Sequence, residues 1–195
     1  MKRLIFAALS FVCILSQCSS NNVPEAPVFE DLKTAADQYS LEDAKKAGYV
    51  IIENGNVSSG EDSWEEFVSQ TGKDTPAKIR VVHYYTLHDP SHYDPQYYVS
   101  IKDDYPKMYI FDLEFDGEKY TERHYEGSKL YEHEYKYLMR YEGEAETPYA
   151  TYSSYVRYVL VNDNTVTWKD ITFEMFSSSS VEITPHSQIY TDLND

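Results

Sequence analysis

The segment 88–95 holds the densest group of side chains that could do chemistry. Imidazole and carboxylate groups are ligands of zinc and other divalent ions, so His88, Asp89, His92 and Asp94 are candidate metal ligands. The segment also holds two prolines, which predict a loop and leave the relative geometry of the two imidazoles open. Asp-Pro is in addition an ordinary turn sequence. We favour a solvated loop, with a metal-dependent enzyme as an alternative.

A second candidate, Glu132-His133-Glu134, lies in a predicted strand. Alternation places both glutamates on one face and the histidine on the other. A carboxylate pair can do acid–base work, but charged alternation on a strand is typical of its solvated face. The sequence has no Gly-x-Ser-x-Gly, His-Glu-x-x-His or phosphate-binding glycine loop. We therefore expect no enzymatic activity and no cofactor.

The twenty tyrosines are the most unusual feature of the composition. They lie almost entirely after Tyr84, in stretches that read as strands, where tyrosine suits a half-buried, pleated surface. A functional interpretation is a stacking face for sugars or peptides. The alternative is sheet packing with the hydroxyls at the solvent edge, which we favour.

Two helices are expected in the first part of the chain, on either side of the short strand predicted over 49–52. Ser40 and Asp43 form a capping box, and Gly48 can end the helix that follows. Acidic residues and apolar side chains at helical spacing predict the second helix over Glu61–Thr71.

Most of the remaining chain reads as strands. Asp116-Gly117 is a strong hairpin signal and predicts a two-residue type I′ turn. Residues 167–176 fit a helix with a capping box at its start, but their alternation also fits a strand; we favour the helix. The predicted strands cover 49–52, 78–86, 96–102, 107–115, 118–126, 129–141, 152–161 and 181–190.

This order of elements predicts an α+β fold, an antiparallel sheet of about five to seven strands with two or three helices packed on one face. Seven apolar residues are expected in its core: Trp64, Phe67, Val81, Ile110, Leu113, Val159 and Trp168.

The N-terminus predicts export. Lys2 and Arg3 precede an uncharged, largely apolar run from Leu4 to Leu15, as in a signal peptide. The run is shorter than the roughly 20 residues that a spanning helix needs.

The run ends in Leu15-Ser16-Gln17-Cys18, which resembles the lipobox of bacterial lipoproteins. The resemblance implies a diacylglycerol on Cys18 and cleavage just before it, although Gln17 stands where a small residue is usual. Two acyl chains hold a protein stably at a bilayer. We therefore expect a lipid anchor at the extracytoplasmic face of the cell membrane; plain secretion and an uncleaved anchor are alternatives.

The chain is thus expected to have three parts: the signal peptide 1–17, which cleavage removes, a flexible tether 18–38 with two prolines, and one globular domain over 39–195. The domain has no cysteine and must fold without a disulfide. The net charge of −16 becomes −18 without Lys2 and Arg3, which excludes the basic surface that nucleic acid binding needs.

The chain resembles small lipoproteins, chiefly of low-GC Gram-positive bacteria, that carry an uncharacterised domain of unknown function. The resemblance covers about residues 44–125 and rests on Asn54-Gly55-Asn56-Val57, on Lys78-Ile79-Arg80 continuing to Tyr85-Thr86, and on the hairpin at 112–117. The family implies location and fold but no activity.

In the family the Tyr-Thr strand and the hairpin lie close together, whereas here residues 87–111 separate them. Function is thus open between three classes. We favour a non-catalytic domain that binds a partner at the cell surface. The alternatives are a solute-binding lipoprotein that holds a sugar or peptide on a tyrosine-lined surface, and a metal-dependent enzyme that uses the loop His88 to Asp94.

Overall fold

The structure of the chain is a computed structural model, and it describes residues 29–145, 147, 150–177 and 184–194. The predicted signal peptide and Cys18 lie outside the described residues, as does the start of the predicted last strand. The described helices are α1 (Leu32–Gln38), α2 (Leu41–Lys46), α3 (Glu61–Thr71), α4 (Pro95–Ile101) and α5 (Trp168–Phe176), with short 3-10 helices η1 (Pro90–His92) and η2 (Lys102–Asp104). The described strands are β1 (Val50–Glu53), β2 (Asn56–Ser59), β3 (Ala77–Tyr85), β4 (Lys107–Phe115), β5 (Tyr120–Glu126), β6 (Lys129–Tyr135), β7 (Tyr137–Glu144), β8 (Ser154–Val161) and β9 (His186–Asn194).

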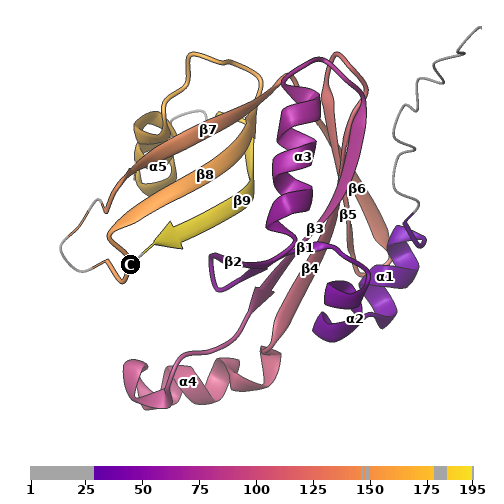
Figure 1. Ribbon diagram of the computed structural model, residues 1–195. Coiled ribbons are helices and arrows are strands. Elements are labelled where there is room, and N and C mark those ends of the chain that lie inside the picture. Colours follow the sequence, from indigo (N-terminus) through magenta and orange to yellow (C-terminus); the bar gives the residue numbers. More distant parts are fainter. Residues whose placement is uncertain (1–28, 146, 148–149, 178–183, 195) are drawn as a thin grey trace, which may run out of the picture.

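The fold is α+β, as predicted, but its strands form two sheets in place of one. Six strands lie in the order β2-β1-β3-β4-β5-β6, and three more lie in the order β7-β8-β9 (Figure 1). The first sheet is mixed, because β1 and β3 are parallel; the chain passes from β1 to β3 through β2 and α3. The predicted strand 129–141 is divided at Lys136, where the chain leaves the first sheet and enters the second.

Helices cover both faces of the first sheet, so the expectation of one covered face is wrong. We call one face of this sheet the outer face; α1 and α2 pack on it through Leu32, Ala35 and Ala44. We call the opposite face the inner face; it is covered by α3 and the second sheet. The helix α5 packs on the far side of the second sheet (Figure 1).

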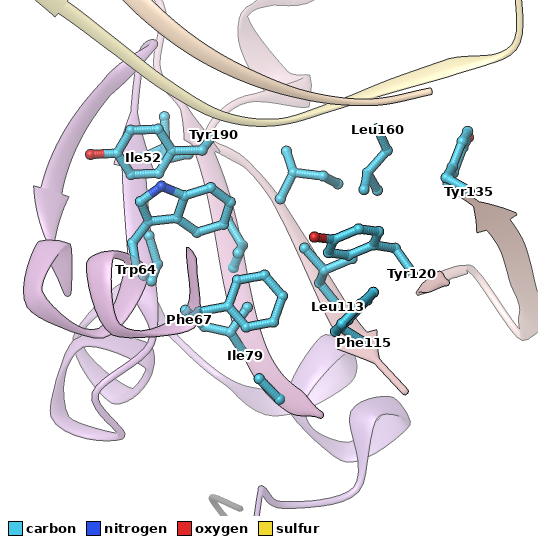
Figure 2. Close-up of a cluster of buried hydrophobic side chains, with 14 residues drawn as sticks. Ile52, Trp64, Phe67, Ile79, Leu113, Phe115, Tyr120, Tyr135, Leu160 and Tyr190 are labelled. Atoms are coloured by element: carbon cyan, nitrogen blue, oxygen red, sulfur yellow. The ribbon is translucent and has the colours of Figure 1, made fainter. Parts of the chain in front are cut away.

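The main core lies between the inner face, α3 and the second sheet. Figure 2 shows Trp64 and Phe67 of α3 beneath Tyr190 of β9; the rings of Trp64 and Tyr190 stack with their centroids 4.6 Å apart. All seven residues predicted to be buried are buried.

The folded part begins earlier than predicted. Residues 29–38 of the expected tether are part of the folded structure, and Leu32 and Ala35 of α1 are buried against the outer face. Asp31 caps this helix by accepting a hydrogen bond from the Thr34 amide at 3.0 Å. An amphipathic turn so short gives only a weak sequence signal, which explains the wrong boundary.

The predicted type I′ turn at Asp116-Gly117 is wrong. Gly117 has a positive φ of 104°, but such a turn requires positive φ at both central positions. The carboxylate of Asp116 instead accepts hydrogen bonds from the amides of Glu118 and Lys119. This side-chain turn closes the β4–β5 hairpin.

A turn with positive φ at both central residues joins β1 and β2. Asn54 and Gly55 have φ of 51° and 90°, and Glu53 pairs directly with Asn56. The strand over 49–52 was predicted from the sequence, but the four-residue strand β2 that follows this turn was missed.

Candidate functional site

The predicted metal-binding segment lies on an arm, residues 87–106, between β3 and β4. Residues 107–111 of the predicted insertion belong to β4 instead. The predicted strand 96–102 is wrong, because residues 95–101 form α4. In Figure 1 this helix lies at the far end of β3 and β4, away from both sheets, and it packs chiefly on η1 and η2.

The four candidate ligands of this arm do not converge. Asp89 caps η1 through the amide and hydroxyl of Ser91, and Asp94 caps α4 through two backbone amides. The rings of His88 and His92 lie 6.2 Å apart between centroids, and both residues are exposed. Within the described residues, no group of three or more His, Cys, Asp or Glu side chains could hold a metal ion.

The second predicted candidate, Glu132-His133-Glu134, is divided between the two faces of the first sheet, as alternation predicts. Glu132 and Glu134 form ion pairs with Arg123 and Lys119. They therefore belong to the charged outer face. His133 lies on the inner face, next to side chains that the sequence did not point to.

These side chains form a continuous group on the inner face, beyond the apolar core. Neighbouring positions in the register bring Phe111, His124 and Tyr131 into one row across β4, β5 and β6. Glu122 and His133 lie side by side in the next row. We define the histidine cluster as His83, Phe111, Glu122, His124, Tyr131 and His133.

Ring contacts connect this cluster. His124 lies between Phe111 and Tyr131, with centroids 5.3 Å and 5.4 Å away, and it stacks on Tyr131 with an interplanar angle of 9°. The His83 ring lies 5.2 Å from Phe111, and the His133 ring 6.3 Å from His124.

Two carboxylates flank the imidazole of His124. Its Nδ1 lies 3.5 Å from an oxygen of Glu122, and its Nε2 lies 3.8 Å from an oxygen of Glu126. Glu122 is only 3% exposed, whereas Glu126 is exposed. The His124 Nδ1 is buried without a hydrogen-bond partner. The cluster thus contains a buried carboxylate and an unsatisfied imidazole nitrogen among aromatic rings.

Burial controls the protonation of two further groups on this face. His83 Nε2 lies 2.7 Å from the carbonyl oxygen of Ile189 in β9, so Nε2 carries the hydrogen. Desolvation lowers the pKa of His83, and this hydrogen bond opposes the shift. Burial, with the negative charge of Glu122 as a second cause, raises the pKa of Tyr135 to about 12. Tyr135 therefore keeps its proton at neutral pH.

The outer face contains a different arrangement, centred on a buried ion pair. Arg80, 1% exposed, donates from Nε and Nη2 to the two oxygens of Asp112 at 2.6 Å and 3.0 Å, and from Nη1 to the Tyr49 hydroxyl at 3.1 Å. Its guanidinium also lies over the rings of Phe29 and Tyr49. Lys78 Nζ is 3.3 Å from Asp112.

A cleft of about 290 Å³ opens beside this pair, under the chain at Phe29. The cleft is lined by three cations, Lys78, Arg80 and Arg123, and each already forms an ion pair with a carboxylate. It therefore presents no unpaired cation to an anionic ligand from these residues, and we assign it a structural role.

Sequence reasoning missed the centre of the histidine cluster. The alternation Tyr120, Glu122, His124 in β5 places a carboxylate and an imidazole on the same face as an aromatic residue. A covered face is expected to carry apolar or aromatic residues. The carboxylate and the imidazole on this face therefore stand out in the sequence.

Comparison of the chain with protein-family models, curated proteins and solved structures finds no match. None of the helices in the described part of the chain is long and apolar enough to cross a membrane.

Proposed function

We propose that the chain is a non-catalytic binding protein, held at the extracytoplasmic face of the cell membrane by a lipid on Cys18, whose ligand contacts the histidine cluster. The observation that supports binding at this place is Glu122, a buried carboxylate with which no Lys or Arg of the described residues forms an ion pair. A buried polar group without a full set of partners carries a free-energy cost that a ligand can offset.

The ring faces around Glu122 support the same location. Aromatic side chains next to hydrogen-bonding groups are typical of sites for sugars and peptides, because a ring packs on the apolar part of the ligand and the polar groups orient it. Tyr131 and His133 lie on β6, an edge strand of the sheet within the described residues, where a ligand can approach. The metal-dependent alternative has no comparable observation in its favour.

Binding can be tested with full-length protein in detergent, titrated with a panel of neutral oligosaccharides and short peptides. We expect at least one class to bind, and the double variant Tyr131→Ala, His133→Ala to lose about tenfold in affinity. The matched control is Tyr97→Ala, because Tyr97 is an exposed tyrosine of the arm. Affinity that falls with Tyr97→Ala and not with the double variant would refute the location.

The anchor is tested separately. Mass spectrometry of membrane-fraction protein is expected to find a diacylated N-terminal cysteine, and Cys18→Ala is expected to release the protein. A Cys18→Ala variant that stays equally bound to membranes would remove this part of the proposal.

A further inference from the structure

The carboxylates on the outer face of β4, β5 and β6 all have cationic partners within the chain. Asp112 pairs with Arg80 and Lys78, and Glu114 and Glu132 share Arg123. Sheets often place opposite charges on neighbouring strands, since such pairs stabilise the sheet.

Glu122 on the inner face departs from this pattern. It is more deeply buried than Glu114 or Glu132, yet among the described residues only His124 forms an ion pair with it, and only when the imidazole is protonated. An ionised carboxylate in a desolvated position is costly unless a cation or several hydrogen-bond donors accompany it. A positively charged donor is the kind of group that would stabilise the Glu122 carboxylate.

The rings around Glu122 suit the same chemistry. The face of an aromatic ring attracts a cation, and the attraction grows where water is excluded. Lys129 already illustrates this on the cluster, because its ammonium nitrogen lies 4.2 Å from the centroid of the Tyr131 ring. The net charge of −16 favours the approach of a cation over that of an anion.

We infer that the histidine cluster binds a lysine side chain of a peptide partner, whose ammonium group donates to Glu122 among the aromatic rings of the cluster. This inference rests on the proposed function and names its ligand. A peptide fits better than a small amine because exposed aromatic surface continues beyond the cluster: Tyr85 and Tyr109 are 38% and 44% exposed, and their rings lie 6.2 Å apart. Such surface can hold the residues that flank the lysine.

The test uses full-length protein in detergent and three probes in isothermal titration. These are acetyl-Gly-Lys-Gly-amide, the same peptide with norleucine in place of lysine, and n-butylamine. We expect the lysine peptide to bind, and both the norleucine peptide and the amine to bind about tenfold more weakly or not at all. Norleucine keeps the four-carbon aliphatic chain and lacks only the ammonium group.

Two variants and one control locate the site. Glu122→Gln is expected to weaken the lysine peptide about tenfold or more, and Tyr131→Leu to weaken it to a smaller extent. Glu132→Gln is the matched control, because it makes the same change on the outer face and is expected to leave affinity unchanged. Melting curves check that each variant is folded, and if Glu122→Gln does not fold, the comparison rests on Tyr131→Leu.

The remaining outcomes overturn the inference. Equal binding of lysine and norleucine peptides would show that charge is not recognised, and equal binding of n-butylamine would show that a small amine is sufficient. A neutral oligosaccharide that binds in a Tyr131-dependent and Glu122-independent way would also overturn it, yet would leave the proposed function intact. Failure of every sugar and peptide would overturn both.

Discussion

Asp112 and Glu122 lie in adjacent strands of one sheet and are similarly buried, 5% and 3% exposed, but they point to opposite faces. Asp112 has a bidentate contact with Arg80, which in turn reaches the Tyr49 hydroxyl. Glu122 has a contact of 3.5 Å with one imidazole nitrogen. The outer carboxylate therefore has two cationic partners, Arg80 and Lys78, whereas the inner one has a single imidazole contact.

This difference separates two uses of a buried charge. A bidentate arginine–carboxylate pair is rigid and fixes the packing of the segments around it, here β3, β4 and the chain at Phe29. A buried carboxylate with a single titratable neighbour contributes little to stability, and it keeps bonding capacity for a ligand. We therefore expect changes on the outer face to affect stability and changes on the inner face to affect binding.

The largest effect is expected from Asp112→Ala. The substitution leaves the Arg80 guanidinium buried and without its bidentate partner, which costs about 3–5 kcal/mol of unfolding free energy. Urea denaturation at neutral pH measures the loss. The control Glu132→Ala breaks an exposed pair and is expected to cost less than about 1 kcal/mol. Equal losses in both variants would mean that burial does not distinguish the two pairs.

A double variant sharpens the same point. Arg80→Met combined with Asp112→Leu removes both charges and leaves neither unpaired, so stability is expected to recover to near that of the wild type. A double variant as unstable as Asp112→Ala would show that the Arg80–Asp112 pair contributes to stability beyond the mutual neutralisation of its two charges.

The next effect is a pH dependence that arises on the inner face. The pKa of His83 is lowered in the folded state from its ordinary value of 6.5. Below 6.5 the unfolded chain binds the proton first, so the stability contributed by neutral His83 is complete above that pH and is lost as the pH falls toward the lowered pKa. We expect the urea concentration at the midpoint of unfolding to decrease as the pH is lowered from 7.5 to 5.5.

The variant His83→Gln tests the origin of this dependence. Glutamine keeps a donor for the Ile189 carbonyl and does not titrate, so the midpoint is expected to vary less over the same pH range. The carboxylates whose pKa values are lowered, such as Asp43 and Asp116, act only at more acidic pH. A midpoint that varies as steeply in His83→Gln as in the wild type would assign the dependence elsewhere.

The sequence predicted those elements whose signals are local. The helix Glu61–Thr71 and the strand Lys107–Phe115 were both predicted with the correct first and last residues. The bounds of the helix are marked by the acidic residues in its first turn and by Gly72 after its last residue. The capping boxes at Ser40 and Thr167 are both present, and the second one decides between helix and strand for 167–176. Side chain to backbone contacts over three residues are visible in a sequence.

Elements that depend on partners were not predictable in this way. Residues 96–102 contain tyrosine, valine and isoleucine, which favour a strand, but the Asp94 cap and the proline at the first helical position give a helix. The histidine cluster depends on the register of three strands, and His83 contacts Ile189 across 106 residues. The cluster depends on strand pairing within the first sheet, and the contact between His83 and Ile189 depends on the packing of the two sheets.

A small effect is expected from Glu122→Gln. The substitution removes a buried charge and leaves no arginine or lysine unpaired, so stability is expected to change by less than about 1 kcal/mol at neutral pH. Urea denaturation compares it directly with Asp112→Ala. A loss similar to that of Asp112→Ala would mean that a cation of the chain already neutralises Glu122, and the lysine site would then have no basis.

The smallest effect is expected on the arm, whose helix α4 packs chiefly on η1 and η2. Both His88 and His92 are exposed, and Asp89 and Asp94 are engaged in local caps, so the double variant His88→Ala, His92→Ala is expected to change stability by less than about 0.5 kcal/mol. A metal that bound only the folded state would raise the melting temperature by mass action. We therefore expect melting of the wild type to respond neither to a chelator nor to excess zinc, manganese or calcium. A metal-dependent rise that the double variant loses would place a ligand site on the arm, and the division between a structural outer face and a binding inner face would no longer account for the function of the molecule.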